Sequence, residues 1–78
     1  MPKVFEQDGF RFFFYSDEHQ PIHIHVDYSG AEARIELTTL KVSNSTLKAK
    51  DLKKALVLTK EYRTRIEQVW DEYFSKNN

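Results

Sequence analysis

The sequence predicts an α+β fold in which an antiparallel sheet of two β-hairpins packs on one long C-terminal α-helix. Two observations predict it. Residues 1–40 contain two tight-turn dipeptides between strand-like runs, and from residue 49 apolar side chains recur at three- and four-residue steps. The chain has 78 residues, of which 40% are apolar and none is cysteine. This length and composition predict a single domain over residues 1–78 with a small core, no disulfide and no cysteine nucleophile.

The first hairpin is predicted at Asp8-Gly9, because both central positions of such a two-residue turn take a positive φ that Asp and Gly tolerate. The strand that follows contains three consecutive phenylalanines, which place aromatic side chains on both faces of the sheet, whereas one helix covers only one face. We therefore expect a loop, a second copy of the chain or another protein to cover Phe13 and Tyr15. Outward pairing from the turn predicts the register Gln7 with Phe10, Glu6 with Arg11, Phe5 with Phe12 and Val4 with Phe13.

A second hairpin is predicted at Ser29-Gly30, and the two-residue period of a strand assigns each of its residues to one face. The predicted apolar face consists of Ile24, Val26, Tyr28, Ala31, Ala33 and Ile35. The predicted polar face consists of His23, His25, Asp27, Glu32, Arg34 and Glu36, with His25 opposite Arg34 and His23 opposite Glu36. We expect these imidazoles, the guanidinium and the carboxylates to form one surface.

Residues 38–48 form a connection in which Leu40 and Val42 alternate as in a short fifth strand. After this connection the spacing of the apolar residues changes from that of a strand to that of a helix. Residues 49–75 have the spacing of one amphipathic helix. Its predicted apolar stripe consists of Leu52, Ala55, Leu56, Thr59, Tyr62, Ile66, Val69, Trp70 and Tyr73. The opposite side carries Lys50, Lys53, Lys54 and Lys60. This basic helical face is either an ordinary solvated surface or a nucleic-acid-binding surface that contacts phosphates independently of base sequence.

Neither a membrane span nor a secretion signal is predicted. No apolar run approaches the ~18 residues that a membrane-spanning helix requires. The opening residues lead directly into a strand-like run and lack the apolar region of a signal peptide. We therefore expect a cytoplasmic protein without a membrane partner.

All three histidines of the chain lie within seven residues, in the run Glu18-His19-Gln20-Pro21-Ile22-His23-Ile24-His25. A strand directs His23 and His25 to the same side, where two imidazoles can bind one divalent metal. The predicted metal ligands are His19, His23, His25 and Glu36. The spacing permits a metal without requiring one, so the cofactor stays unknown.

The same residues also suit chemistry without a metal. Imidazoles titrate near neutral pH, so His23 and His25 could act as general base and acid, with His19 in support. Arg34 could bind a phosphate or stabilise developing negative charge, a combination that suits RNA cleavage by the RNA's own 2′-hydroxyl. The structural alternative is a salt bridge from Arg34 to Glu32, Glu36 or Asp27, with histidines that only order the loop before Pro21.

The chain resembles the short prokaryotic proteins of domain-of-unknown-function family 4160. The resemblance depends on five features: Met1-Pro2 with Val4-Phe5, the run Gly9-Phe10-Arg11-Phe12-Phe13-Phe14-Tyr15-Ser16, the motif Glu18-His19-x-Pro21-x-His23-x-His25-Val26, the run Gly30-Ala31-Glu32-Ala33-Arg34, and Trp70-x-x-Tyr73-Phe74. It implies a small α+β domain, often encoded beside a partner of domain-of-unknown-function family 2442. Some such pairs look like toxin–antitoxin modules, in which this type of protein would be the toxin.

Two functions are consistent with these observations. The first is the toxin-like component of a bacterial toxin–antitoxin module that acts on RNA through His23, His25 and Arg34, bound to a cognate antitoxin-like protein. The second is a non-enzymatic regulatory module that binds nucleic acid or protein and has structural or metal-binding histidines. Either function agrees with a homodimer or a hetero-complex, and whether the chain is an enzyme stays open.

Overall fold

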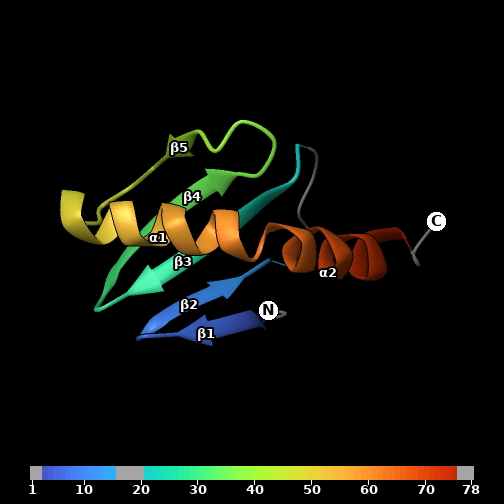
Figure 1. Ribbon diagram of the computed structural model, residues 1–78, viewed down its shortest axis with the longest axis horizontal. Helices are drawn as coiled ribbons and strands as arrows, with labels where there is room; N and C mark the ends of the chain where they lie inside the picture. Colours follow the sequence, from blue (N-terminus) through green and yellow to red (C-terminus); the bar gives the residue numbers. More distant parts are fainter. Residues whose placement is uncertain (1–2, 16–20, 76–78) are drawn as a thin grey trace.

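The computed structural model, which describes residues 3–15 and 21–75, contains one antiparallel sheet and two helices on one side of it (Figure 1). The elements are β1 (Lys3–Gln7), β2 (Phe10–Phe13), β3 (His23–Tyr28), β4 (Ala31–Glu36), β5 (Val42–Ser43), α1 (Ala49–Glu61) and α2 (Arg63–Ser75). The strand order is β1-β2-β3-β4-β5, so consecutive strands are neighbours in the sheet. In Figure 1, α1 crosses the strands and α2 extends past one end of them. The predicted α+β class is confirmed.

Both predicted hairpin turns are present. Asp8 and Gly9 have φ angles of 54° and 84°, and Ser29 and Gly30 have φ angles of 50° and 84°. These left-handed values are those of the tight turn whose twist matches that of the flanking strands. Each turn therefore depends on a glycine that tolerates positive φ at its second position.

The predicted register of β3 with β4 is confirmed, including His25 opposite Arg34 and His23 opposite Glu36. The predicted register of β1 with β2 is confirmed for the three pairs nearest the turn. The predicted pairing of Val4 with Phe13 is wrong. Lys3 lies opposite Phe13 instead, because a β-bulge shifts the register between Lys3 and Phe5. A regular strand would expose Val4 on the open face, whereas the bulge turns Val4 into the core and Lys3 into water.

The short fifth strand is confirmed, and it extends the sheet beyond β4. Ile35 pairs with Val42, and Arg34 pairs with Ser43. Further along, the Thr46 backbone N–H donates to the Glu32 carbonyl at 2.8 Å, and the Glu32 N–H donates to Oγ1 of Thr46 at 3.0 Å. The connection between the sheet and α1 therefore follows the edge of β4.

The predicted helix spans the expected residues but is interrupted at Tyr62, whose φ and ψ are −101° and 17°. The Tyr62 hydroxyl donates to Oε1 of Gln7 at 2.6 Å, and its ring lies 4.4 Å from the ring of Phe5. Backbone hydrogen bonds continue across the interruption, because the Tyr62 N–H donates to Leu58 and the Ile66 N–H donates to Tyr62. Contact with β1 thus accompanies a local change of helix geometry. Neither described helix is long and apolar enough to cross a membrane.

The core lies between the sheet and the helices. The predicted apolar stripe is largely confirmed, since Ala55, Thr59, Ile66 and Trp70 are buried. Trp70 packs edge-on against Phe14, with ring centroids 5.0 Å apart. The strands contribute the buried side chains Val4, Phe10, Phe12, Ile24, Val26, Ala33 and Ile35.

Phe13, on the other face of the sheet, is only 3% exposed within the single chain. Its ring lies 5.5 Å from the ring of Tyr15 and 5.6 Å from that of His25, and the Arg11 guanidinium lies 5.3 Å from its centroid. Covering Phe13 therefore requires no second molecule. Tyr15 stays 39% exposed.

Candidate functional site

The candidate site lies on the side of the sheet that faces away from the helices. The strand register places Phe13 of β2, His25 of β3 and Arg34 of β4 in one cross-strand row. Side chains of directly opposite residues lie about 5 Å apart at their Cβ atoms. We call this surface the histidine face and define it by Arg11, Phe13, Tyr15, His25, Asp27, Glu32, Arg34 and Glu36.

His25 occupies the centre of this row and is half-buried. Its ring is 4.5 Å from the ring of Tyr15, in an edge-on arrangement, and 5.6 Å from the ring of Phe13. Aromatic neighbours on two sides restrict the orientations that an imidazole can adopt. His25 is thus a positioned imidazole on a partly accessible surface.

His23 differs from the prediction, which put it on the polar surface beside His25. It is only 1% exposed, and its ring lies 5.5 Å from the indole of Trp70 and 5.1 Å from the ring of His25. Its Nδ1 lies 2.8 Å from the carbonyl oxygen of Pro21, and because a carbonyl can only accept, Nδ1 is the donor. His23 is buried because α2 extends past the end of the sheet and brings Trp70 over it.

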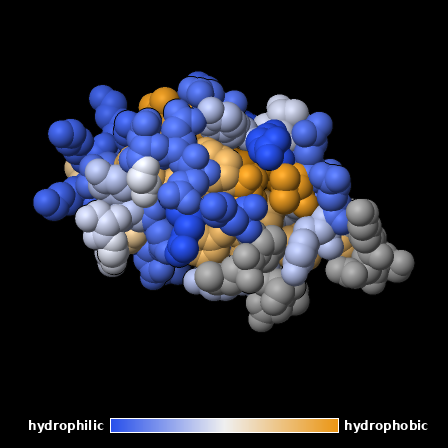
Figure 2. Space-filling model, turned by 90° about the horizontal axis from the view of Figure 1, so that it is seen from below, coloured by the Kyte–Doolittle hydropathy of each residue, from blue (hydrophilic) through white to orange (hydrophobic). Residues whose placement is uncertain are grey.

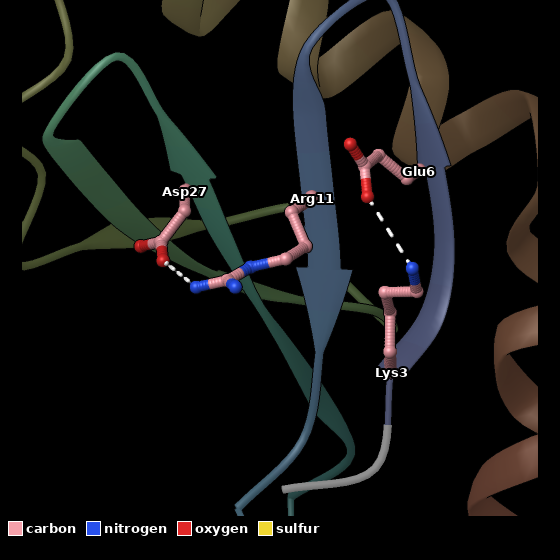
Figure 3. A network of polar contacts seen from close by, with 4 residues as sticks. All are labelled: Lys3, Glu6, Arg11 and Asp27. Atoms are coloured by element: carbon pink, nitrogen blue, oxygen red, sulfur yellow. Dashed lines mark hydrogen bonds and ion pairs between the residues drawn. The ribbon is translucent and has the colours of Figure 1, made fainter.

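Arg34 is half-buried and makes no ion pair with any described residue. Its three expected salt-bridge partners lie on the same face but do not pair with it. The Asp27 carboxylate accepts a hydrogen bond from the Arg11 guanidinium (Figure 3), with an N–O distance of 2.5 Å, and Oε2 of Glu36 accepts from the Thr39 hydroxyl at 3.1 Å. The Glu32 carboxylate forms no ion pair in the described parts of the chain. The guanidinium of Arg34 therefore keeps its donors available for an external anion.

The predicted metal site is only partly within the described structure. Glu18 and His19 lie outside the described residues. Among residues 3–15 and 21–75, no group of three or more histidine, aspartate or glutamate side chains is placed to bind a metal. A metal bound by His23, His25 and Glu36 would therefore depend on His19 and remains a prediction.

The predicted basic face is on α1, on the other side of the sheet from the histidine face. Lys50, Lys53, Lys54 and Lys60 are all exposed. Lys54 is held at the first hairpin, because its Nζ lies 3.1 Å from the Asp8 carboxylate and 5.9 Å from the centroid of the Phe10 ring. The lysines and the histidine face are separated by the core, so they form two surfaces and not one site.

Sequence reasoning did not assign Tyr15 to the site, although its two-residue spacing from Phe13 already indicated a shared face. A separate polar depression of about 380 Å³ lies where the second hairpin turn meets the start of α1. It is lined by Tyr28, Ser29, Ala31, Thr46, Lys48 and Asp51, none of which is a predicted site residue.

Comparison with known proteins identifies one similarity. A family model described as Domain of unknown function (DUF4160) matches residues 9–71. No curated protein matches the chain, and no solved structure matches it. The matched region includes β2 to β5, all three histidines, Arg34 and most of both helices, which confirms the family expected from the motifs.

Proposed function

The chain belongs to the family described as Domain of unknown function (DUF4160), and from this premise we propose that it is the toxin-like component of a bacterial toxin–antitoxin module. We propose that it acts on RNA through His25 and Arg34. The observation that carries this proposal is a half-buried guanidinium that has no ionic partner in the described structure and lies directly opposite a positioned imidazole. Such a pair combines anion binding with proton transfer.

In this proposal Arg34 binds one phosphate of the RNA, because its planar fork matches two phosphate oxygens. The imidazole of His25 accepts the proton of the neighbouring 2′-hydroxyl as that oxygen attacks phosphorus. The bond to the 5′-oxygen breaks, and the 5′-oxygen takes up a proton from the imidazolium or from water. This chemistry requires no protein nucleophile, in agreement with a chain that has no cysteine.

We assign His23 a positioning role instead of the second proton-transfer role expected from the sequence. Its burial keeps it away from a bound phosphate. Its hydrogen bond to Pro21 and its contact with Trp70 hold the ring against His25. His19, the predicted supporting residue, lies outside the described structure and keeps that role as a prediction.

The test compares Arg34 with an arginine outside the histidine face. Arg34→Ala is expected to abolish growth inhibition on expression and RNA cleavage by the purified protein, as is His25→Ala. Arg65→Ala is the control, because Arg65 is exposed on α2 and outside the histidine face, and it should keep activity. Retained cleavage in both Arg34→Ala and His25→Ala, with folding verified by circular dichroism, would refute the proposal.

We also propose that the cognate antitoxin-like partner, of the family 2442 type, covers the histidine face. Tyr15 is an exposed aromatic side chain on that face, and aromatic side chains are frequent anchors in interfaces. Tyr15→Asp should prevent complex formation with the co-expressed partner while the chain remains folded. A complex that forms equally well with this variant would place the partner elsewhere.

A second candidate function is a non-enzymatic nucleic-acid-binding module. It is favoured by Lys50, Lys53 and Lys60, which are exposed on α1 and have no acidic partner among the described residues. Its test is a salt titration of RNA and DNA binding, in which affinity should fall steeply as salt rises. Reversing these three charges should abolish binding under this alternative, whereas Arg34→Ala should leave it unchanged.

A further inference from the structure

The outer edge of β1 is a surface that neither helix nor any described strand pairs with. The sheet ends at β1 on one side and at the two-residue β5 on the other. An edge strand presents backbone N–H and C=O groups that can pair with another chain. Figure 2 views the molecule from the β1 side and shows apolar side chains among hydrophilic ones near the middle of this side.

The bulge gives this edge an uncommon arrangement of side chains. In the hairpin, Gln7 and Phe5 pair with β2 through their backbones, so Glu6 directs its backbone groups outward. The bulge releases the residues between Lys3 and Phe5 from the regular ladder. It also brings Lys3 and Glu6 to the same side, where Nζ and Oε1 lie 3.3 Å apart (Figure 3). These side chains are 57% and 52% exposed.

The sequence of β1, Lys3-Val4-Phe5-Glu6-Gln7, is complementary to itself when two copies run antiparallel about a twofold axis between Val4 and Phe5. Lys3 of one copy then lies opposite Glu6 of the other, and Val4 lies opposite Phe5. Both pairs occur twice by symmetry. A shift of one residue in either direction places Lys3 opposite Phe5 or Val4 opposite Glu6, so only this register matches charge with charge and apolar with apolar side chains.

We propose that two copies of the chain associate through β1 in this register and form one continuous sheet with five strands from each copy. Association replaces the Lys3–Glu6 ion pair within each chain by two such pairs between the chains. Losing the pair within one chain costs little free energy, because that pair is exposed. A twofold axis that joins antiparallel edge strands is perpendicular to the sheet. The dimer therefore presents both histidine faces on one side and both lysine-rich α1 faces on the other. This inference is independent of the proposed function.

Sedimentation equilibrium of the full chain tests the interface. The protein should show a concentration-dependent dimer, and the single variants Lys3→Glu and Glu6→Lys should each weaken self-association by about tenfold or more, because each places like charges opposite each other twice. An equimolar mixture of the two variants should restore association, since every reversed charge then meets an opposite charge on the other copy. The pair within each chain stays repulsive in that mixture, so only an intermolecular contact explains recovery.

Lys53→Glu is the matched control, because it makes the same charge change on α1 and should leave association unchanged. Circular dichroism verifies that each variant is folded. A protein that is monomeric at all concentrations would overturn the proposal, as would a dimer that is insensitive to both β1 variants. Failure of the mixed variants to associate would also overturn it. None of these results would bear on RNA cleavage, so this proposal and the proposed function fail separately.

Discussion

Replacing His23 with alanine is expected to lower the free energy of unfolding by about 3 kcal/mol, the sum of two contributions. Truncating a fully buried ring against Trp70 leaves a cavity that costs about 2 kcal/mol, at the low end for large-to-small core changes. Loss of the Nδ1 donor leaves the Pro21 carbonyl without its partner, which costs about 1 kcal/mol. For a domain of this size each kcal/mol shifts the melting temperature by about 4–8 °C, so the expected decrease exceeds about 10 °C.

The assay is thermal and urea unfolding followed by circular dichroism, with His25→Ala as the comparison. His25 is only half-buried, so its truncation should cost about 1 kcal/mol. His23→Phe keeps the ring volume but loses the donor, and it should fall between the two, at about 1–2 kcal/mol. If His23→Ala melts within a few degrees of the unmodified protein, the packing of His23 under α2 is wrong. If His25→Ala is the more destabilising change, the assignment of roles to the two histidines is wrong.

Three further predictions concern other parts of the molecule. Tyr62→Phe removes the hydroxyl that donates to β1, and urea unfolding should show a loss of about 1 kcal/mol; an unchanged midpoint would contradict the role of this bond. Gly9→Ala and Gly30→Ala should each lower the free energy of unfolding by about 1 kcal/mol, because both φ angles are positive. The melting temperature should decrease more for Gly9→Ala, because a Cβ at Gly9 would lie 3.3 Å from the Tyr28 ring. Equal decreases would contradict this close approach. Glu36→Gln removes a negative charge two residues from Arg34, so RNA affinity should rise by about two- to fivefold at low salt and by less at high salt. Weaker RNA binding by this variant would show that the Glu36 carboxylate does not repel RNA.

The separation of the two candidate surfaces affects how a regulatory partner could act. A partner on the histidine face would leave the α1 lysines exposed, because the core lies between them. A complex of this kind could lose RNA cleavage and still bind nucleic acid through α1 in a salt-dependent manner. Measuring RNA cleavage and nucleic-acid binding in the free chain and in the complex shows whether the partner blocks only the histidine face or also releases the protein from nucleic acid.

The candidate site could be predicted in part. The opposition of His25 and Arg34 follows from the second hairpin alone, because a two-residue turn sets the register and the register sets the faces. The absence of an ion pair at Arg34 within the described structure could not be predicted. Asp27 is bound by Arg11 and Glu36 by Thr39, whereas Glu32 has no ionic partner among the described residues and still does not pair with Arg34. The outcome depends on where each side chain lies, which the strand register alone does not set.

Local chemistry in the sequence determined the turns, the strand register beside them, the two faces of the sheet and the extent of the helical region. These features depend on residues that are close in the chain, through positive φ at glycine and the periods of strands and helices. The tertiary structure alone decided the bulge at Val4, the interruption at Tyr62 and the burial of His23 under Trp70. Each of these three depends on contact between segments distant in sequence, where burial of apolar surface and one side-chain hydrogen bond outweigh local preference.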